Sequence, residues 1–146
     1  MNFTTVFTLL LLAIAIASPT PAIPATGLMQ GVALPQPRTE GVVTYMSGGA
    51  GKAESAAMNV EAKHYPLSLF FSSGNGSEYL ADVHVTIKDR TGKDVLSAVS
   101  EGPVMLVKIP EGKYTVVADA NGKALHDTVK ITATNRERLS FHWPRV

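Results

Sequence analysis

Hydrophobic and polar residues alternate in short runs from residue 41 onward, and this alternation is typical of β-strands. The segment 79–89 shows it most clearly, because polar residues separate Val83, Val85 and Ile87. Asn121-Gly122 predicts a type I′ hairpin turn, since both residues tolerate positive φ. In chain order, strands are predicted at 41–47, 66–73, 79–89, 94–100, 103–109, 113–120, 123–134 and 138–143.

The segment 53–65 has helical rather than alternating spacing, through Ala57, Met58 and Glu61, and Pro66 ends it. Many short strands at regular spacing predict an all-β fold. We expect an antiparallel β-sandwich of about seven strands, transthyretin-like or Ig-like, with one short N-terminal helix. The predicted core contains the inward-facing residues Leu67, Leu69, Phe71, Val83, Val85, Ile87, Met105, Val107, Ile109, Tyr114, Val116, Val129, Ile131, Leu139, Phe141 and Trp143.

The N-terminal segment differs from the rest of the chain. Residues 6–17 are apolar apart from Thr8, and this run is shorter than the about 20 residues that span a membrane. We interpret residues 1–17 as a secretory signal peptide, with cleavage after Ala17 or as late as Ala22. Residues 18–40 contain five prolines and are predicted to be a disordered leader before a β-sandwich domain at 41–146. The expected location is therefore periplasmic or secreted, with no membrane span in the mature form.

Charge and cysteine content narrow the function classes. The 13 basic and 12 acidic residues all lie from Arg38 onward and are mixed in sign. Nucleic-acid binding and binding to acidic membranes need clustered positive charge, so we expect neither. The chain has no cysteine, which excludes disulfides, thiol catalysis and a lipid-modified cysteine.

Residues 80–133 resemble the carboxypeptidase regulatory-like domain, a transthyretin-like β-sandwich. The motifs that carry the resemblance are "ADVHVTIKDRTGK", "IPEGKYTVVA" and the closing "VKITA". In that family a tyrosine after the Pro-x-Gly corner packs into the sandwich, and Tyr114 matches it. The family's aromatic turn before the corner is missing here, where the chain reads "SEGPVML". Residues 41–146 also resemble small exported proteins of Gram-negative bacteria that have no assigned function, so the resemblance implies a fold and a compartment but no catalytic residues.

Four histidines are the first candidates for a ligand site: His64, His84, His126 and His142. No pair of them has the close spacing of a metal site within one segment. The last three occupy polar positions of strands, so we expect them to face outward. The alternative is that two of them share an exposed face and bind a metal.

Other polar motifs have simpler interpretations. The stretch "SGGAGKA" at 47–53 lacks the spacing of a phosphate-binding loop, so we expect residues 48–52 to form a hinge or a recognition loop. Asn75-Gly76-Ser77 is either a glycosylation sequon or a turn. Asp127 lies on the apolar phase of its strand, which predicts an edge position or a paired carboxylate. Five carboxylates lie at or near predicted strand ends: Asp82, Asp89, Asp94, Glu101 and Glu111. We expect them to lie in solvated turns, and the alternative is that some of them form carboxylate pairs.

These observations favour a non-catalytic exported module that binds a protein or glycan partner through loops or a strand edge. We predict no catalytic, cofactor-binding or metal-ligating residues and no cofactor. The alternative is an accessory protein that binds a metal or small ligand through His84, His126 or His142. A hydrolase of unrecognised type is the third hypothesis, and it requires a cleft with clustered carboxylates or an activated serine.

Overall fold

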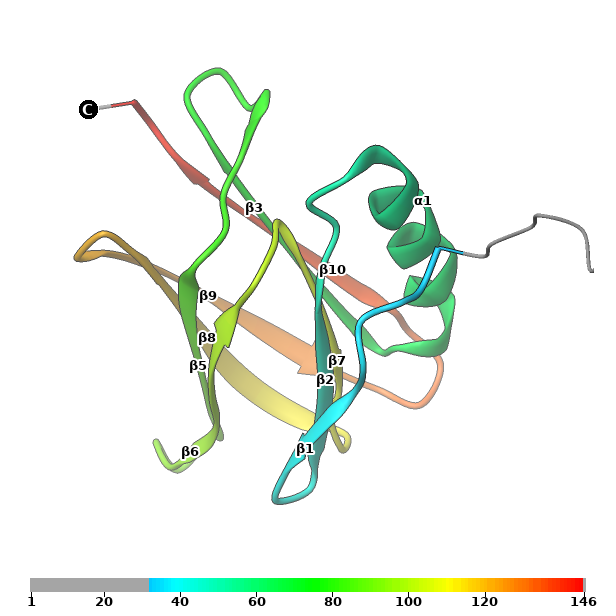
Figure 1. Cartoon of the computed structure of the whole chain (residues 1–146). Coiled ribbons are helices and arrows are strands. Elements are labelled where there is room, and N and C mark those ends of the chain that lie inside the picture. Colours follow the sequence, from blue (N-terminus) through cyan, green and yellow to red (C-terminus); the bar gives the residue numbers. More distant parts are fainter. Residues whose placement is uncertain (1–31, 146) are drawn as a thin grey trace, which may run out of the picture.

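The structure, a computed structural model, describes residues 32–145. It is mostly β, with ten strands in two sheets and one helix in the described residues, and it confirms the predicted sandwich-like fold class (Figure 1). The elements, in chain order, are β1 (Arg38–Glu40), β2 (Val43–Gly48), α1 (Lys52–Glu61) continued by the 3₁₀ turn η1 (Ala62–His64), β3 (Leu67–Ser73), β4 (Glu78–Tyr79), β5 (Val83–Lys88), β6 (Asp94–Ser100), β7 (Val104–Lys108), β8 (Gly112–Ala120), β9 (Lys123–Ile131) and β10 (Glu137–Trp143).

The strands form two sheets. Sheet A has the order β1-β2-β7-β3-β10, with β4 paired to β3, and sheet B has the order β6-β5-β8-β9. Helix α1 lies against β2 and β7 of sheet A, on the side away from β8 and β9 (Figure 1). The outer face of sheet B carries no helix within the described residues. One face of the molecule is therefore an open four-stranded sheet.

The predicted all-antiparallel pairing is wrong for the last strand. β10 pairs parallel with β3, over the register Glu137↔Leu67 to Trp143↔Ser73. The chain leaves β9 in sheet B and crosses to sheet A. There β10 lies beside β3 and runs in the same direction. The single strand predicted at 79–89 is likewise divided into β4 and β5, because Asp82 interrupts it with a φ of 58°.

The main core fills the space between the sheets. Every predicted core residue is buried except Leu139, which is half-buried and packs against the same cluster. Phe71, Phe141 and Trp143 form an aromatic group with ring centroids 6.1–6.4 Å apart. The Trp143 indole N–H donates to the Lys123 carbonyl at 2.8 Å and so ties β10 to β9. Burying each large apolar side chain stabilises the fold by about 1.5–3 kcal/mol.

A second apolar cluster joins α1 to sheet A, and the predicted core does not include it. Met58 of α1 is fully buried against Met46, Tyr65, Val104 and Leu106. β7 is consequently buried on both faces over its first four residues, and these residues, "VMLV", are a continuous apolar run rather than an alternating one. A strand covered on both sides loses alternation, so this apolar run was itself a sequence signal for the second buried face.

The domain starts slightly earlier than its predicted boundary at residue 41. β1 pairs with β2 through Arg38↔Tyr45, and Gly41 supplies the turn with a φ of 58°. Residues 38–40 therefore form a strand rather than the end of the disordered leader. The predicted signal peptide (1–17, or as far as 22) and leader residues 18–31 lie outside the described residues. Within residues 32–145, no helix combines the length and hydrophobicity required to cross a bilayer.

Candidate functional site

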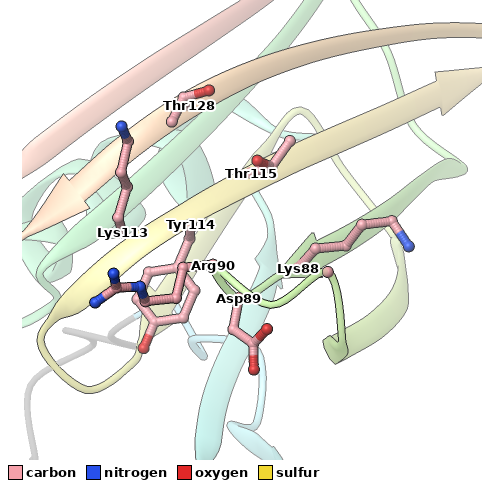
Figure 2. A pocket seen from close by; sticks show the side chains of 8 residues that line it. Lys88, Asp89, Arg90, Lys113, Tyr114, Thr115 and Thr128 are labelled. Atoms are coloured by element: carbon pink, nitrogen blue, oxygen red, sulfur yellow. The ribbon is translucent and has the colours of Figure 1, made fainter.

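A shallow hollow of about 580 Å³ lies at one end of sheet B. The end of β5 and the turn after it contribute Lys88 and Arg90, and β8 contributes Lys113 and Thr115. Thr128 of β9 completes the wall beside them. Figure 2 shows Lys113 and Thr115 on one strand with Thr128 on its neighbour. Cationic and hydroxyl side chains therefore line the hollow, which we call the basic hollow.

The register of the β8–β9 hairpin places another cation, Lys130, at the edge of the basic hollow. Lys113 lies directly opposite Lys130, and Thr115 lies directly opposite Thr128. Side chains at directly opposite positions share one face of a sheet, and here both lysines are exposed on the outer face. Two positive charges consequently stand side by side next to the hollow.

Few carboxylates neutralise these cations. Lys88 forms an ion pair with Asp94 across the β5–β6 hairpin. In residues 32–145, no carboxylate lies within ion-pair distance of Arg90, Lys113 or Lys130. Directly opposed like charges destabilise a sheet by a fraction of a kcal/mol, at about 0.2–1 kcal/mol per pair. An anion bound between the two lysines would remove that cost.

Among the described residues, Asp89 is the one acidic residue in the wall of the basic hollow. Its carboxylate accepts hydrogen bonds from the Thr91 hydroxyl at 2.6 Å and from the Thr91 and Lys93 backbone N–H groups at 2.9 and 3.1 Å. These hydrogen bonds, that of the Thr91 hydroxyl first, lower the pKa of Asp89. Figure 2 shows its carboxylate directed away from Lys113, Thr115 and Thr128. Asp89 thus stabilises the turn, and its carboxylate does not neutralise Lys113 or Lys130.

Tyr114 closes the hollow from the core side. Its side chain is buried, and its hydroxyl donates to the Pro110 carbonyl at 2.9 Å across the Pro-x-Gly corner. Burial raises the pKa of Tyr114, so the phenol keeps its proton. The tyrosine predicted to pack at the corner does so, and it holds the turn that precedes Lys113.

Two of the four candidate histidines line one hollow, and the other two lie elsewhere. His84 lies on the outer face of sheet B, with its ring nitrogen 3.2 Å from the Ser97 hydroxyl, and His64 ends η1. His126 and His142 line one open hollow between the β9 and β10 edges, together with Asp127. Within residues 32–145, no group of three or more His, Asp or Glu side chains is arranged to hold a metal ion.

The first two residues of the glycine segment at 48–52 are held in place, whereas residues 50–52 are exposed. The Gly49 N–H donates to the Glu54 carboxylate of α1 at 2.9 Å, and Gly48 and Gly49 are buried. Gly48 also lies against Gly102, where an added Cβ would come within 2.3 Å of the Gly48 carbonyl oxygen. The loop therefore joins strand and helix by close backbone packing, as a connecting segment does.

The carboxylates at strand ends occupy separate places. Asp94 pairs with Lys88, and Glu101 pairs with Arg38 at 2.9 Å. Asp82 and Glu111 are exposed. Asp127 is exposed on the inward phase of β9, which is an edge strand of sheet B, so the predicted edge position is confirmed. Asn75-Gly76-Ser77 lies in the turn between β3 and β4.

The lysines of the basic hollow were not singled out from the sequence, although a signal for them exists. A two-residue turn at Asn121-Gly122 places Ala120 opposite Lys123. Counting outward along both strands then places Lys113 opposite Lys130. A search for runs of charge along the chain does not find this pair, because Lys113 and Lys130 are far apart in sequence and meet only across the hairpin.

Comparison with known proteins identifies a family. No curated protein matches the chain. The family model described as the Rhizobiales growth-associated tandem repeat domain matches residues 67–141, from β3 to β10. The match is to this family rather than to a named carboxypeptidase regulatory-like domain, and it spans all of sheet B and the part of sheet A from β3 onward, without β1 and β2. The chain therefore belongs to the bacterial family of Rhizobiales growth-associated tandem repeat domains.

Proposed function

We propose that the protein is a non-catalytic, exported interaction module of the bacterial envelope, and that its basic hollow binds an anionic envelope component. The observation that carries this proposal is the pair Lys113 and Lys130, opposite each other on an uncovered sheet face without a carboxylate partner in the described residues. The description of the family as growth-associated supports a role connected with growth.

The chemistry of the hollow supports an anionic ligand. Lys113, Lys130 and Arg90 provide positive charge, and the hydroxyls of Thr115 and Thr128 provide neutral donors between them. The hollow is shallow and lies on a sheet face, as suits the binding of an extended partner rather than the enclosure of a substrate. Partly exposed charges at such a surface accelerate association and give salt-dependent affinity.

The exported location rests on residues 1–17. Their apolar run would direct the chain across the inner membrane, and signal peptidase would release the domain into the periplasm or beyond. Cell fractionation with an antibody against the domain tests this step. A shorter, soluble periplasmic form supports it, and a full-length cytoplasmic form contradicts it.

The finer relationship to the carboxypeptidase regulatory-like sandwich is also a proposal. The hydrogen bond from Tyr114 to the Pro110 carbonyl at the Pro-x-Gly corner supports it. An experimental structure that superimposes on that domain with the same strand order would establish it.

Anion binding is tested with hexaglutamate and tripolyphosphate as probes in NMR titrations at low and high salt. We expect the amide signals of residues 88–93, 113–115 and 128–130 to shift, and affinity to fall as salt increases. The double variant Lys113→Gln, Lys130→Gln should lose most of the binding, whereas Lys63→Gln on η1 should retain it. Equal binding by both variants, or shifts elsewhere, would contradict the proposal.

A second candidate function is the binding of a metal or small ligand at the seam between β9 and β10. The observation that favours it is the placement of His126 and His142 on one hollow of about 420 Å³. Calorimetric titration with Zn²⁺ and Cu²⁺, compared with the His142→Gln variant, separates this candidate from anion binding. Metal binding that this variant abolishes would support it, and heats equal to those of buffer would exclude it.

A further inference from the structure

The outer face of sheet A is only partly covered by α1. The helix packs on β2 and β7 through Met58, and a hollow of about 240 Å³ opens beside it over β3 and β10. We call this hollow the α1–β10 groove, and the side chains that matter in it are Ser55, Asn59, Phe70, Tyr79, Arg138 and Ser140. It lies on the opposite sheet from the basic hollow.

The floor of the groove is an aromatic ring covered by a guanidinium group. The guanidinium carbon of Arg138 lies 3.7 Å from the centroid of the half-buried Phe70 ring. Stacking on an aromatic ring holds a guanidinium group in one orientation while its N–H donors stay free for a ligand. In residues 32–145, no carboxylate lies within ion-pair distance of Arg138. The groove thus contains a fixed, uncompensated cation.

A second aromatic ring stands at the rim. Tyr79 is 72% exposed and belongs to the short strand β4, where it lies opposite Ser72 on the outer face of sheet A. Its exposed ring contributes little to the core of the protein. Rings at such positions are typical of binding surfaces, because they combine a flat apolar face with a polar hydroxyl.

The remaining side chains are uncharged and can both donate and accept hydrogen bonds. Ser55 and Asn59 face the groove from α1, and Ser140 faces it from β10. Arg138 is the only charged side chain that lines the groove among the described residues. β3 lies between β7 and β10, so its backbone groups bond within the sheet. A ligand that lies over β3 is therefore recognised through side chains.

We propose that the α1–β10 groove binds a saccharide that carries a carboxylate group. The C–H face of a sugar ring would lie on Tyr79, its hydroxyls would bond to Ser55, Asn59 and Ser140, and its carboxylate would accept the parallel N–H bonds of Arg138. The volume of about 240 Å³ is below the about 300–1,000 Å³ of drug-sized pockets, so the groove accommodates a single sugar ring of a chain that continues into solvent.

The experiment is an NMR titration of the ¹⁵N-labelled protein with digalacturonic acid, compared with the neutral disaccharide galactobiose. We expect amide shifts at residues 55–59, 70, 79 and 138–140, and tighter binding of the acidic sugar. Arg138→Gln should weaken digalacturonic acid about tenfold, to the level of galactobiose. Tyr79→Ala should weaken both sugars about fivefold, because both lose the stacking surface.

Arg136→Gln is the matched control, because Arg136 is an exposed arginine that does not line the groove. It should leave both affinities unchanged. The exposure of Arg138 and Tyr79 means that their variants should fold, which the dispersion of the amide spectrum checks. The proposal is overturned if millimolar digalacturonic acid shifts no groove signal, if Arg136→Gln and Arg138→Gln weaken binding equally, or if the shifts appear at 113–115 and 128–130 instead.

Discussion

Lys113 and Lys130 lie directly opposite each other on β8 and β9, with both side chains exposed on the outer face of sheet B. Replacing one member by an acid turns a repulsive pair into an attractive one. Lys130→Glu should therefore raise the free energy of unfolding by about 0.5 kcal/mol in urea titrations at low salt. The same change should weaken the binding of hexaglutamate.

Salt provides the control for this prediction. In 1 M NaCl the Debye length falls to about 3 Å, so the stability difference between Lys130→Glu and the parent protein should disappear. Lys63→Glu reverses one charge at a distant site and should change neither quantity. A gain in stability that is unaffected by salt would show that charge repulsion between the two lysines is not its cause.

The contact between Gly48 and Gly102 should be intolerant of side chains. A Cβ at Gly102 would lie 2.3 Å from the Gly48 carbonyl oxygen and 2.5 Å from its carbonyl carbon, which are backbone atoms that cannot rotate away. Gly102→Ala should lower the free energy of unfolding by about 1–3 kcal/mol. Gly51→Ser is the control, since nothing lies within 4 Å of the Cβ built at that position and serine is favoured at the N-cap of α1, which Gly51 occupies. Thermal unfolding measures both variants, and equal stabilities would disprove the close contact.

The Tyr114 hydroxyl should contribute to stability through the Pro110 carbonyl, which it meets at 2.9 Å. Tyr114→Phe removes the donor and keeps the ring, so the loss should be about 0.5–1.5 kcal/mol. Tyr79→Phe removes a hydroxyl from an exposed ring and should leave stability unchanged. Urea unfolding at neutral pH distinguishes the two, and a Tyr114→Phe variant as stable as the parent would contradict the assigned bond.

Asp127 should protect the open edge of sheet B. It places an exposed charge on the inward phase of edge strand β9, between Leu125 and Val129, and such charges hinder strand addition by another molecule. Asp127→Val should produce concentration-dependent association in sedimentation velocity. Asp127→Lys keeps a charge at the position and should sediment like the parent protein. If the two variants sediment alike, the charge does not protect the edge.

Local patterns in the sequence determined most elements of this protein, together with one part of its candidate site. Alternation located the strands, and the turn at Asn121-Gly122 set the register of β8 and β9, which implies Lys113 opposite Lys130. Both signals are local, because side-chain alternation and turn geometry depend on residues next to one another. The buried face of each alternating strand, such as Val83, Val85 and Ile87, followed from the same pattern.

Only the tertiary structure decided which strands became neighbours. β10 joins β3 in parallel, and α1 covers β2 and β7 but leaves β3 and β10 open. These choices bring Arg138 onto Phe70 and place His142 and His126 on one hollow. Alternation specifies the face on which a side chain lies, but not the sheet or the neighbour that this face meets. The packing free energy between segments distant in the chain selects those neighbours, so the α1–β10 groove exists only in the folded protein.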